Sequence, residues 1–161
     1  MIVRVKQLKF NLLALLGVGL MIAGLLSPWW GFTTNKNTES FLYPYIIKGP
    51  VTGMIGYNRS SQMELLTAGL VVAILLGICG SFLHNRLGRL FLFLSGLITA
   101  AFIWRFFVRL TGFIEFYNVP LQGTGGAEYM GEYVAEATSS LQAGLYLSGA
   151  GTGIVILAII V

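Results

Sequence analysis

Four long apolar runs take up most of this chain of 161 residues and constrain its fold more than any other feature. They cover residues 12–27, 65–83, 90–108 and 141–161. A helix needs about 20 residues to cross a hydrocarbon core roughly 30 Å thick, and each run is that long or nearly so. The sequence therefore predicts a small α-helical membrane protein with several spans.

The composition agrees with this class, because 56% of the residues are hydrophobic and only 10% are charged. We expect an all-α integral membrane protein: a four-helix transmembrane bundle with a small extracytoplasmic β-hairpin or sheet and a protruding hairpin of the last two helices. The whole chain, 1–161, is expected to form one domain. The expected spans are about 10–27, 65–83, 88–110 and 140–161, and the outer loops are 28–62 and 111–139.

The placement of charge predicts the orientation, because Lys and Arg close to span ends favour the cytoplasmic side. Basic residues precede the first run and fill the short turn between the second and third runs: Arg4, Lys6, Lys9, Arg86 and Arg89, with His84. The acids all fall in the two longer connections: Glu39, Glu64, Glu115, Glu128, Glu132 and Glu136. We therefore expect a multi-pass protein of the cell membrane with both termini cytoplasmic.

Small residues at a spacing of four let membrane helices approach each other closely. The run 65–83 carries three consecutive steps of this kind, so we expect its helix to lie at the centre of the bundle. The predicted helix-packing residues are Gly69, Ala73, Gly77, Ser81, Gly149 and Gly153.

The first outer connection opens with Trp29 and Trp30, where aromatic residues anchor proteins at a membrane interface. Three segments after the first run have strand character, and Phe41, Tyr43, Tyr45 and Ile47 alternate onto one face. The turn signal Lys48-Gly49-Pro50 predicts a hairpin between the second and third segments, with Pro44 marking an edge strand. The segments are 29–34, 41–47 and 51–57.

This organisation resembles that of the claudin-like tetraspan proteins. The shared features are inner termini, a first outer loop with strands and tryptophan, a very short inner turn and a long third helix. Trp29-Trp30-Gly31 resembles the aromatic-glycine cluster of that loop, whereas the paired cysteines of the loop are absent. The resemblance is one of architecture, and it implies strands in the outer loop.

The second outer connection predicts a helical hairpin. Apolar character continues past the expected membrane boundary until Asn118-Val-Pro120 stops it, and residues 127–139 then read as a helix that leads into the last span. Closing this hairpin around residues 119–126 places Arg109 opposite Glu136, which predicts a structural ion pair.

Arg105 lies one turn deeper than Arg109, and ionisable residues inside a membrane tend to be paired or functional. The functional interpretation is a contact with an anion, a lipid headgroup or a quinone-type molecule. The structural interpretation is that the arginine extends to the outer interface or pairs with Glu136.

Glu128, Glu132 and Glu136 recur at a spacing of four, which would align them on one face of a helix. This pattern is typical of a solvated face, and a basic partner surface or a divalent cation are the alternatives. The hypothetical partner-binding residues are Trp29, Trp30, Glu128, Tyr129, Glu132 and Tyr133.

Side chains that could catalyse a reaction or bind a metal are scarce in this sequence. The chain has no Asp, one His and one Cys, and Cys79 lies within an apolar run without a nearby base. We therefore expect no enzyme, no cofactor, no metal site and no nucleic-acid binding.

The predicted function is that of a structural or accessory subunit, or a scaffold, in a larger membrane assembly. Its partners would be the lipid bilayer and other membrane subunits, or further copies of the chain. The alternative is an oligomeric channel or transporter component that uses Arg105 and Arg109 for a small anion or a lipid-like molecule.

Overall fold

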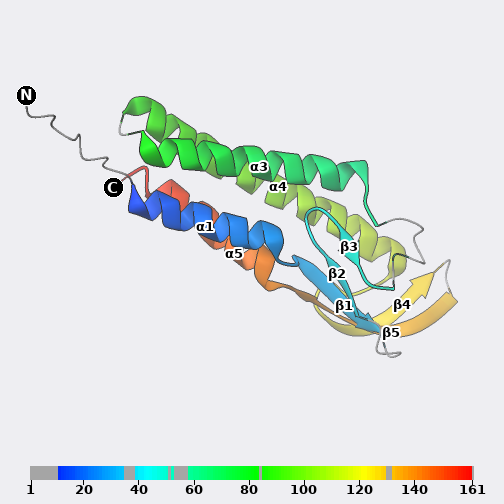
Figure 1. Ribbon diagram of the computed structural model, residues 1–161. Helices are drawn as coiled ribbons and strands as arrows, with labels where there is room; N and C mark the ends of the chain where they lie inside the picture. Colours follow the sequence, from blue (N-terminus) through cyan, green and yellow to red (C-terminus); the bar gives the residue numbers. More distant parts are fainter. Residues whose placement is uncertain are drawn as a thin grey trace, which may run out of the picture.

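A computed structural model of the chain describes residues 11–34, 39–50, 52, 58–83, 85–129 and 132–160. Within these residues, four long helices lie at one end of the molecule and a sheet of five strands lies at the other (Figure 1). The helices are α1 (Leu12–Leu26), α3 (Ser61–Phe82), α4 (Arg86–Tyr117) and α5 (Ala143–Leu157). The strands are β1 (Trp30–Thr34), β2 (Glu39–Leu42), β3 (Ile47–Lys48), β4 (Gly123–Tyr129) and β5 (Glu132–Leu141).

The sheet is antiparallel, and its order β3-β2-β1-β5-β4 combines both outer connections. The central strand β1 pairs with β2 on one side, where Trp30 lies opposite Leu42, and with β5 on the other, where Trp30 lies opposite Leu141. Because β1 follows α1 and β5 precedes α5, the sheet continues directly from this helix pair (Figure 1).

The helices form two antiparallel pairs, α1 with α5 and α3 with α4, and the pairs meet where α1 contacts α3 and α4 contacts α5. Glycine allows α1 and α5 to approach closely. A Cβ atom on Gly17 would lie 2.8 Å from the carbonyl oxygen of Gly151, and one on Gly151 would lie 2.5 Å from that of Gly17. No helix is central in this arrangement, so the predicted central position of the run 65–83 is wrong.

The predicted packing residues of α3 all face neighbouring helices. A Cβ atom on Gly69 would meet the ring of Phe102, and one on Gly77 would lie 2.6 Å from Val18. Ala73 and Ser81 are fully buried, and the Ser81 hydroxyl donates to the carbonyl oxygen of Gly77 at 2.7 Å.

The predicted packing residues of α5 lie differently. Gly149 and Gly153 have no neighbouring atom within 4 Å of the position that a Cβ would take. The close approach instead uses two other glycines of α5. Gly151 faces α1, and Gly144 faces Ser27 and Pro28 at the C-terminal end of α1.

The prediction of an all-α fold is wrong, because residues 127–129 belong to β4 and residues 132–139 to β5 instead of a helix. Alanine and glutamate favour a helix in isolation, but β1 offers a free edge, and residues 137–141 form a ladder with it. Glycines at 123, 125 and 126 disfavour a helix in the preceding segment, and aromatic and β-branched residues at 133, 134 and 138 suit strands. Such tertiary pairing outweighs local propensity.

The prediction of four membrane-spanning helices is also wrong. Among the residues that the structure describes, only α3 and α4, with 22 and 32 residues, are long and apolar enough to cross a membrane, by length and composition. Helices α1 and α5 have 15 residues each, which corresponds to a length of about 22 Å. They are short because Asn11 and Ser27-Pro28 bound α1, and because Leu141 still belongs to β5.

The hairpin in the first connection has a different register from the predicted one. Strand β2 pairs with β3, with Leu42 opposite Ile47, so Pro44 lies in the turn between them. The fixed backbone angle of proline suits a turn and removes a donor from a ladder. The expected strand at 51–57 falls almost wholly outside the described residues.

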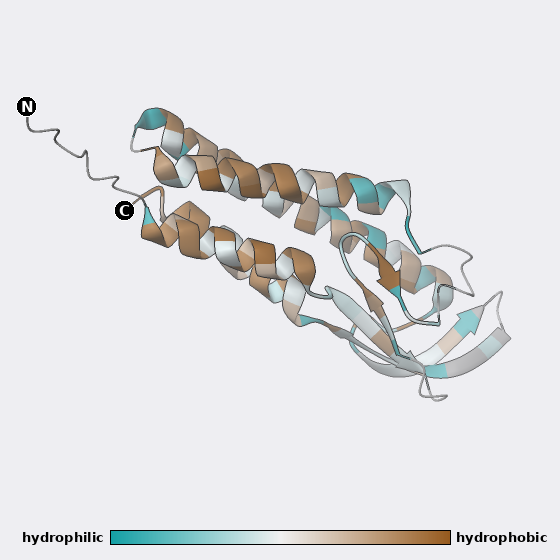
Figure 2. Ribbon diagram, in the orientation of Figure 1, coloured by the Kyte–Doolittle hydropathy of each residue, from teal (hydrophilic) through white to brown (hydrophobic). Residues whose placement is uncertain are grey.

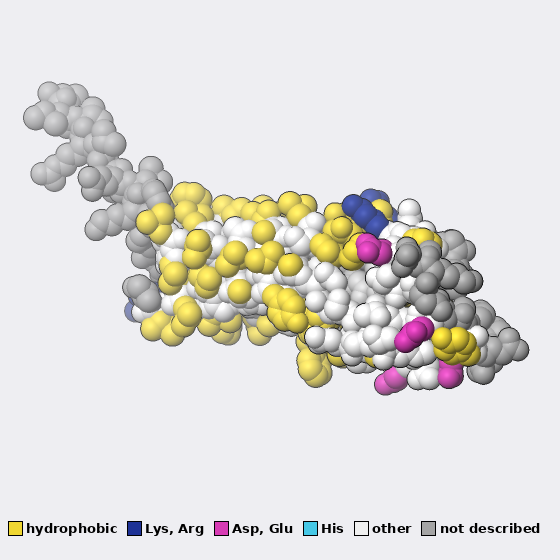
Figure 3. Space-filling view, turned by 90° about the horizontal axis from the view of Figure 1, so that it is seen from below, with side chains coloured by type: hydrophobic (Ala, Val, Ile, Leu, Met, Phe, Trp, Pro, Cys, Tyr) yellow, Lys and Arg dark blue, Asp and Glu magenta, His cyan; other side chains and the backbone are white. Residues whose placement is uncertain are grey.

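Hydropathy divides the molecule along its length. The helices carry mostly hydrophobic residues, and polar residues gather at their ends and on the sheet (Figure 2). Many large hydrophobic side chains of the helices are exposed, and acidic side chains appear only toward the sheet on the face in Figure 3. Each of the two longest helices contains an apolar stretch of 18 residues. Only 39% of this stretch is buried in α3, and only 28% in α4. The apolar surface of the helices thus exceeds what the fold buries.

Replacement of Gly151 by leucine should destabilise the protein by about 1–3 kcal/mol, because the side chain would enter the contact with α1. Gly149→Leu, two residues away on the same helix, is the matched control and should have little effect. Thermal unfolding in detergent, followed by circular dichroism, measures the difference. Equal losses for both variants would contradict the close approach of α1 and α5.

Candidate functional site

The junction between the helices and the sheet is built around the tryptophan pair that follows α1. The Trp29 side chain is fully buried, and its indole N–H donates to the carbonyl oxygen of Gly24 at 2.9 Å. Its ring meets that of Phe106 on α4 edge to face, with centroids 4.9 Å apart. Trp29 therefore fixes the exit of α1 against the middle of α4.

Trp30 begins β1 and is 2% exposed. Its indole N–H donates to the carbonyl oxygen of Leu121 at 3.1 Å, and its ring lies near those of Phe32 and Phe113. Both tryptophans thus lie in the core, although the sequence pointed to an interfacial anchor and a partner-binding role.

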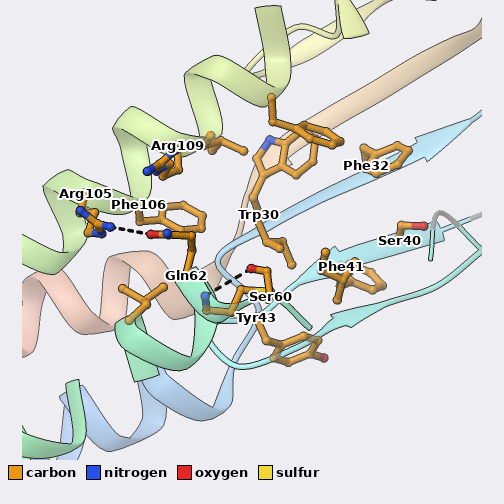
Figure 4. Close-up of a pocket in the computed structure, with 16 residues that line it drawn as sticks. Trp30, Phe32, Ser40, Phe41, Tyr43, Ser60, Gln62, Arg105, Phe106 and Arg109 are labelled. Carbon is orange, nitrogen blue, oxygen red and sulfur yellow. Dashed lines mark hydrogen bonds between the residues drawn. The ribbon is translucent and has the colours of Figure 1, made fainter. Parts of the chain in front are cut away.

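A cavity of about 290 Å³ lies beside Trp30, between the strands β1 to β3 and the sheet-proximal parts of α3 and α4 (Figure 4). Aromatic and aliphatic side chains form most of its wall. These are Trp30, Phe32, Phe41, Leu42, Tyr43, Ile47, Met63, Leu66, Phe106, Leu110 and Phe113. Its volume is close to the lower end of the roughly 300–1,000 Å³ that is usual for small-molecule sites.

Most polar groups of the wall lie on the helical side, and Ser40 lies on β2. Arg105 and Arg109, one turn apart on α4, line the cavity together with Ser40, Ser60 and Gln62. The guanidinium of Arg105 donates to the side-chain oxygen of Gln62, and Figure 4 shows the two side chains directed toward each other. Gln62 and Arg109 are exposed while Arg105 is half-buried, so these three residues mark where the cavity meets the surface.

The two arginines lack an acidic partner within the described part of the chain, where no salt bridge joins either of them to a carboxylate. Glu136, the predicted partner of Arg109, lies on β5 opposite Gly126. The predicted pair depended on a helical register, which the strands replace. The cavity therefore carries two positive charges at its mouth and no described negative charge to balance them.

The remaining predicted site residues lie on the β4–β5 hairpin. Glu128 faces Tyr133 across the ladder, and Tyr129 faces Glu132, so the acids do not share the face of a helix. Tyr133 is 66% exposed. The side chains of Tyr129 and Glu132 lie outside the described residues, as do Arg4, Lys6, Lys9 and His84. No group of three possible metal ligands occurs among the residues that the structure describes.

Sequence reasoning missed the cavity, although two signals for it were present. The alternation of Phe41 and Tyr43 placed both on one face, and both line the cavity. On α4, Phe106, Leu110 and Phe113 recur at helical spacing next to the two arginines, which indicates an apolar stripe bordered by charge.

No protein-family model matches this chain, and a comparison with curated proteins finds no match either.

Trp30→Phe should lower the free energy of unfolding by about 1–3 kcal/mol, because it leaves the carbonyl oxygen of Leu121 without its donor. Trp104→Phe is the matched control, since Trp104 is 72% exposed. Thermal unfolding of both variants checks this prediction. A Trp30 variant as stable as the Trp104 variant would mean that the indole does not hold the sheet to the connection after α4.

Proposed function

We propose that the helical half of the protein lies in the lipid bilayer of the cell membrane, with α3 and α4 crossing it and the sheet outside. The low burial of these two helices supports this, since the core helix of a soluble protein is mostly buried. Exposed leucine, valine and phenylalanine side chains on all four described helices would face lipid.

The orientation that we propose places the sheet on the extracytoplasmic side and the turn between α3 and α4 on the cytoplasmic side. Arg86 and Arg89 begin α4 at the end opposite the sheet, where positive charge favours the cytoplasm. Glu39, Glu128 and Glu136 lie on strands of the sheet.

Within that setting, the protein functions as a non-catalytic binding protein for a lipid-like molecule. The observation that carries this proposal is the cavity between sheet and helices, which is apolar inside and flanked by Arg105 and Arg109 where it opens. Pockets of this kind, with apolar walls and a few convergent polar groups, are the usual form of small-molecule sites. A molecule from the surrounding bilayer would bury its apolar part against the aromatic wall.

A role as accessory subunit or scaffold is the second candidate, and the edge of the sheet favours it. Strand β4 forms one edge of the described sheet, and its glycine-rich sequence offers an edge to which a further strand can add. The exposed ring of Tyr133 lies over Gly126 beside this edge and would suit a protein interface.

The proposed orientation can be tested by labelling cysteines in intact cells with a membrane-impermeant maleimide. Cys79→Ser removes the native thiol, after which Thr124→Cys on β4 should react from outside. Leu83→Cys, at the turn between α3 and α4, should react only after the cells are made permeable. The opposite pattern would reverse the orientation.

Leu66→Trp tests the pocket, because Leu66 is buried and lines the cavity, so that an indole would occupy part of the space. Native mass spectrometry of the protein, released from mild detergent, should find a bound lipid-like molecule on the unmodified chain. The affinity should fall by roughly tenfold in the variant, which corresponds to a loss of about 1.4 kcal/mol, and the bound fraction should fall with it.

The matched control is Leu65→Trp, since Leu65 is the preceding residue of α3 and is exposed. It should retain the bound molecule. Equal occupancy in all three proteins would contradict binding in this cavity, and melting temperatures in the same detergent would reveal any general loss of fold.

A further inference from the structure

We infer that the ligand of the pocket is an amphiphile with one alkyl chain and an anionic head, a carboxylate or a phosphate. This inference rests on the proposed binding function and adds the chemical class of the molecule. Arg105 and Arg109 would hold the head, and the aromatic wall around Trp30 and Phe106 would hold the chain.

The volume of the cavity limits the size of the apolar part. At about 290 Å³, the cavity lies at the lower end of the roughly 300–1,000 Å³ that is usual for small-molecule sites. A single alkyl chain suits a site of this size better than the two chains of a membrane phospholipid.

The two positive charges at the mouth of the cavity determine the charge of the ligand's head. Arginines four residues apart on a helix repel each other, and an anion between them would turn this repulsion into attraction. Guanidinium groups bind carboxylate and phosphate through paired, charge-assisted hydrogen bonds. The amide of Gln62 already accepts from Arg105 and orients it toward the cavity. Arg109 is exposed and has no described partner, so its donors are available to a ligand.

A neutral ligand such as a quinone fits these charges less well. A carbonyl oxygen would accept a hydrogen bond from one arginine, but it carries no charge to offset the repulsion between the two cations. Around the half-buried Arg105, the apolar wall also strengthens the attraction of an anion, because water screens the charges less there.

The test uses probes that share one brominated chain and differ only in the head: 11-bromoundecanoate, 11-bromoundecyl phosphate and 11-bromoundecanol. Bromine quenches tryptophan fluorescence on contact. The chain has three tryptophans, and Trp104→Phe removes the exposed one, so that Trp29 and Trp30 report on the pocket. Protein in lipid nanodiscs is titrated at alkaline pH, where the carboxylic acid is ionised and arginine stays charged.

We expect saturable quenching by the anionic probes at concentrations at least roughly tenfold below those that the alcohol requires, as one or two charge-assisted hydrogen bonds would give. Arg105→Gln with Arg109→Gln should abolish this preference, so that the anionic probes bind no better than the alcohol. Arg109→Gln alone should weaken the preference for the anionic probes in part, and this substitution changes only an exposed residue. Arg89→Gln removes the same charge from the other end of α4 and should have no effect.

Binding of only one of the two anionic probes supports the inference and identifies the head as a carboxylate or a phosphate. Equal binding of the alcohol, with no effect of the arginine variants, would overturn the anionic head while the pocket retained its binding function. The absence of saturable quenching by every probe would overturn the binding function itself and the inference with it.

Discussion

The continuous contact between two segments, 11–34 and 137–157, determines the arrangement of the rest of the structure. The segments form a hydrogen-bonded ladder as strands β1 and β5 and, further along, pack against each other as helices α1 and α5. Between the strands and the helices, the backbone N–H of Gln142 donates to the carbonyl oxygen of Trp29 at 3.0 Å. The backbone N–H of Gly144 donates to the carbonyl oxygen of Pro28 at 2.9 Å. Hydrogen bonds thus bridge the change from strand to helix, so the sheet cannot tilt independently of the helix pair.

The cavity follows from this rigid connection. Helix α4 continues past the ends of α1 and α5 and stands beside the sheet (Figure 1). Two hydrogen bonds hold the β2–β3 hairpin over α3. The backbone N–H of Trp29 donates to the carbonyl oxygen of Leu42 at 2.8 Å, and the Thr67 hydroxyl donates to the carbonyl oxygen of Pro44 at 3.1 Å. Sheet and helices are therefore fixed at their margins, while the space between them is left incompletely filled.

Much of the fold was accessible from sequence where the signal is local. The end of α1 at Ser27-Pro28, the end of α4 at Asn118 and the strand after Trp29 all depend on nearby residues. The strands β4 and β5 were not accessible, because the pairing of residues 137–141 with β1 joins parts of the chain that are far apart in sequence. The cavity had local signals on each of its walls, but Phe41 and Phe106 lie 65 positions apart, and only the tertiary pairing brings these walls together.

The arginines of α4 illustrate how structure separates two explanations that sequence leaves open. An arginine that merely extends toward a membrane interface needs an exposed side chain with a hydrated head. Arg109 meets this condition, since it is exposed. Arg105 does not, because it is half-buried, lines the cavity and donates to Gln62. Its position one turn behind Arg109 places a second cation where the apolar wall begins. Extension to an interface accounts for one of these charges, whereas an anion at the mouth of the cavity accounts for both.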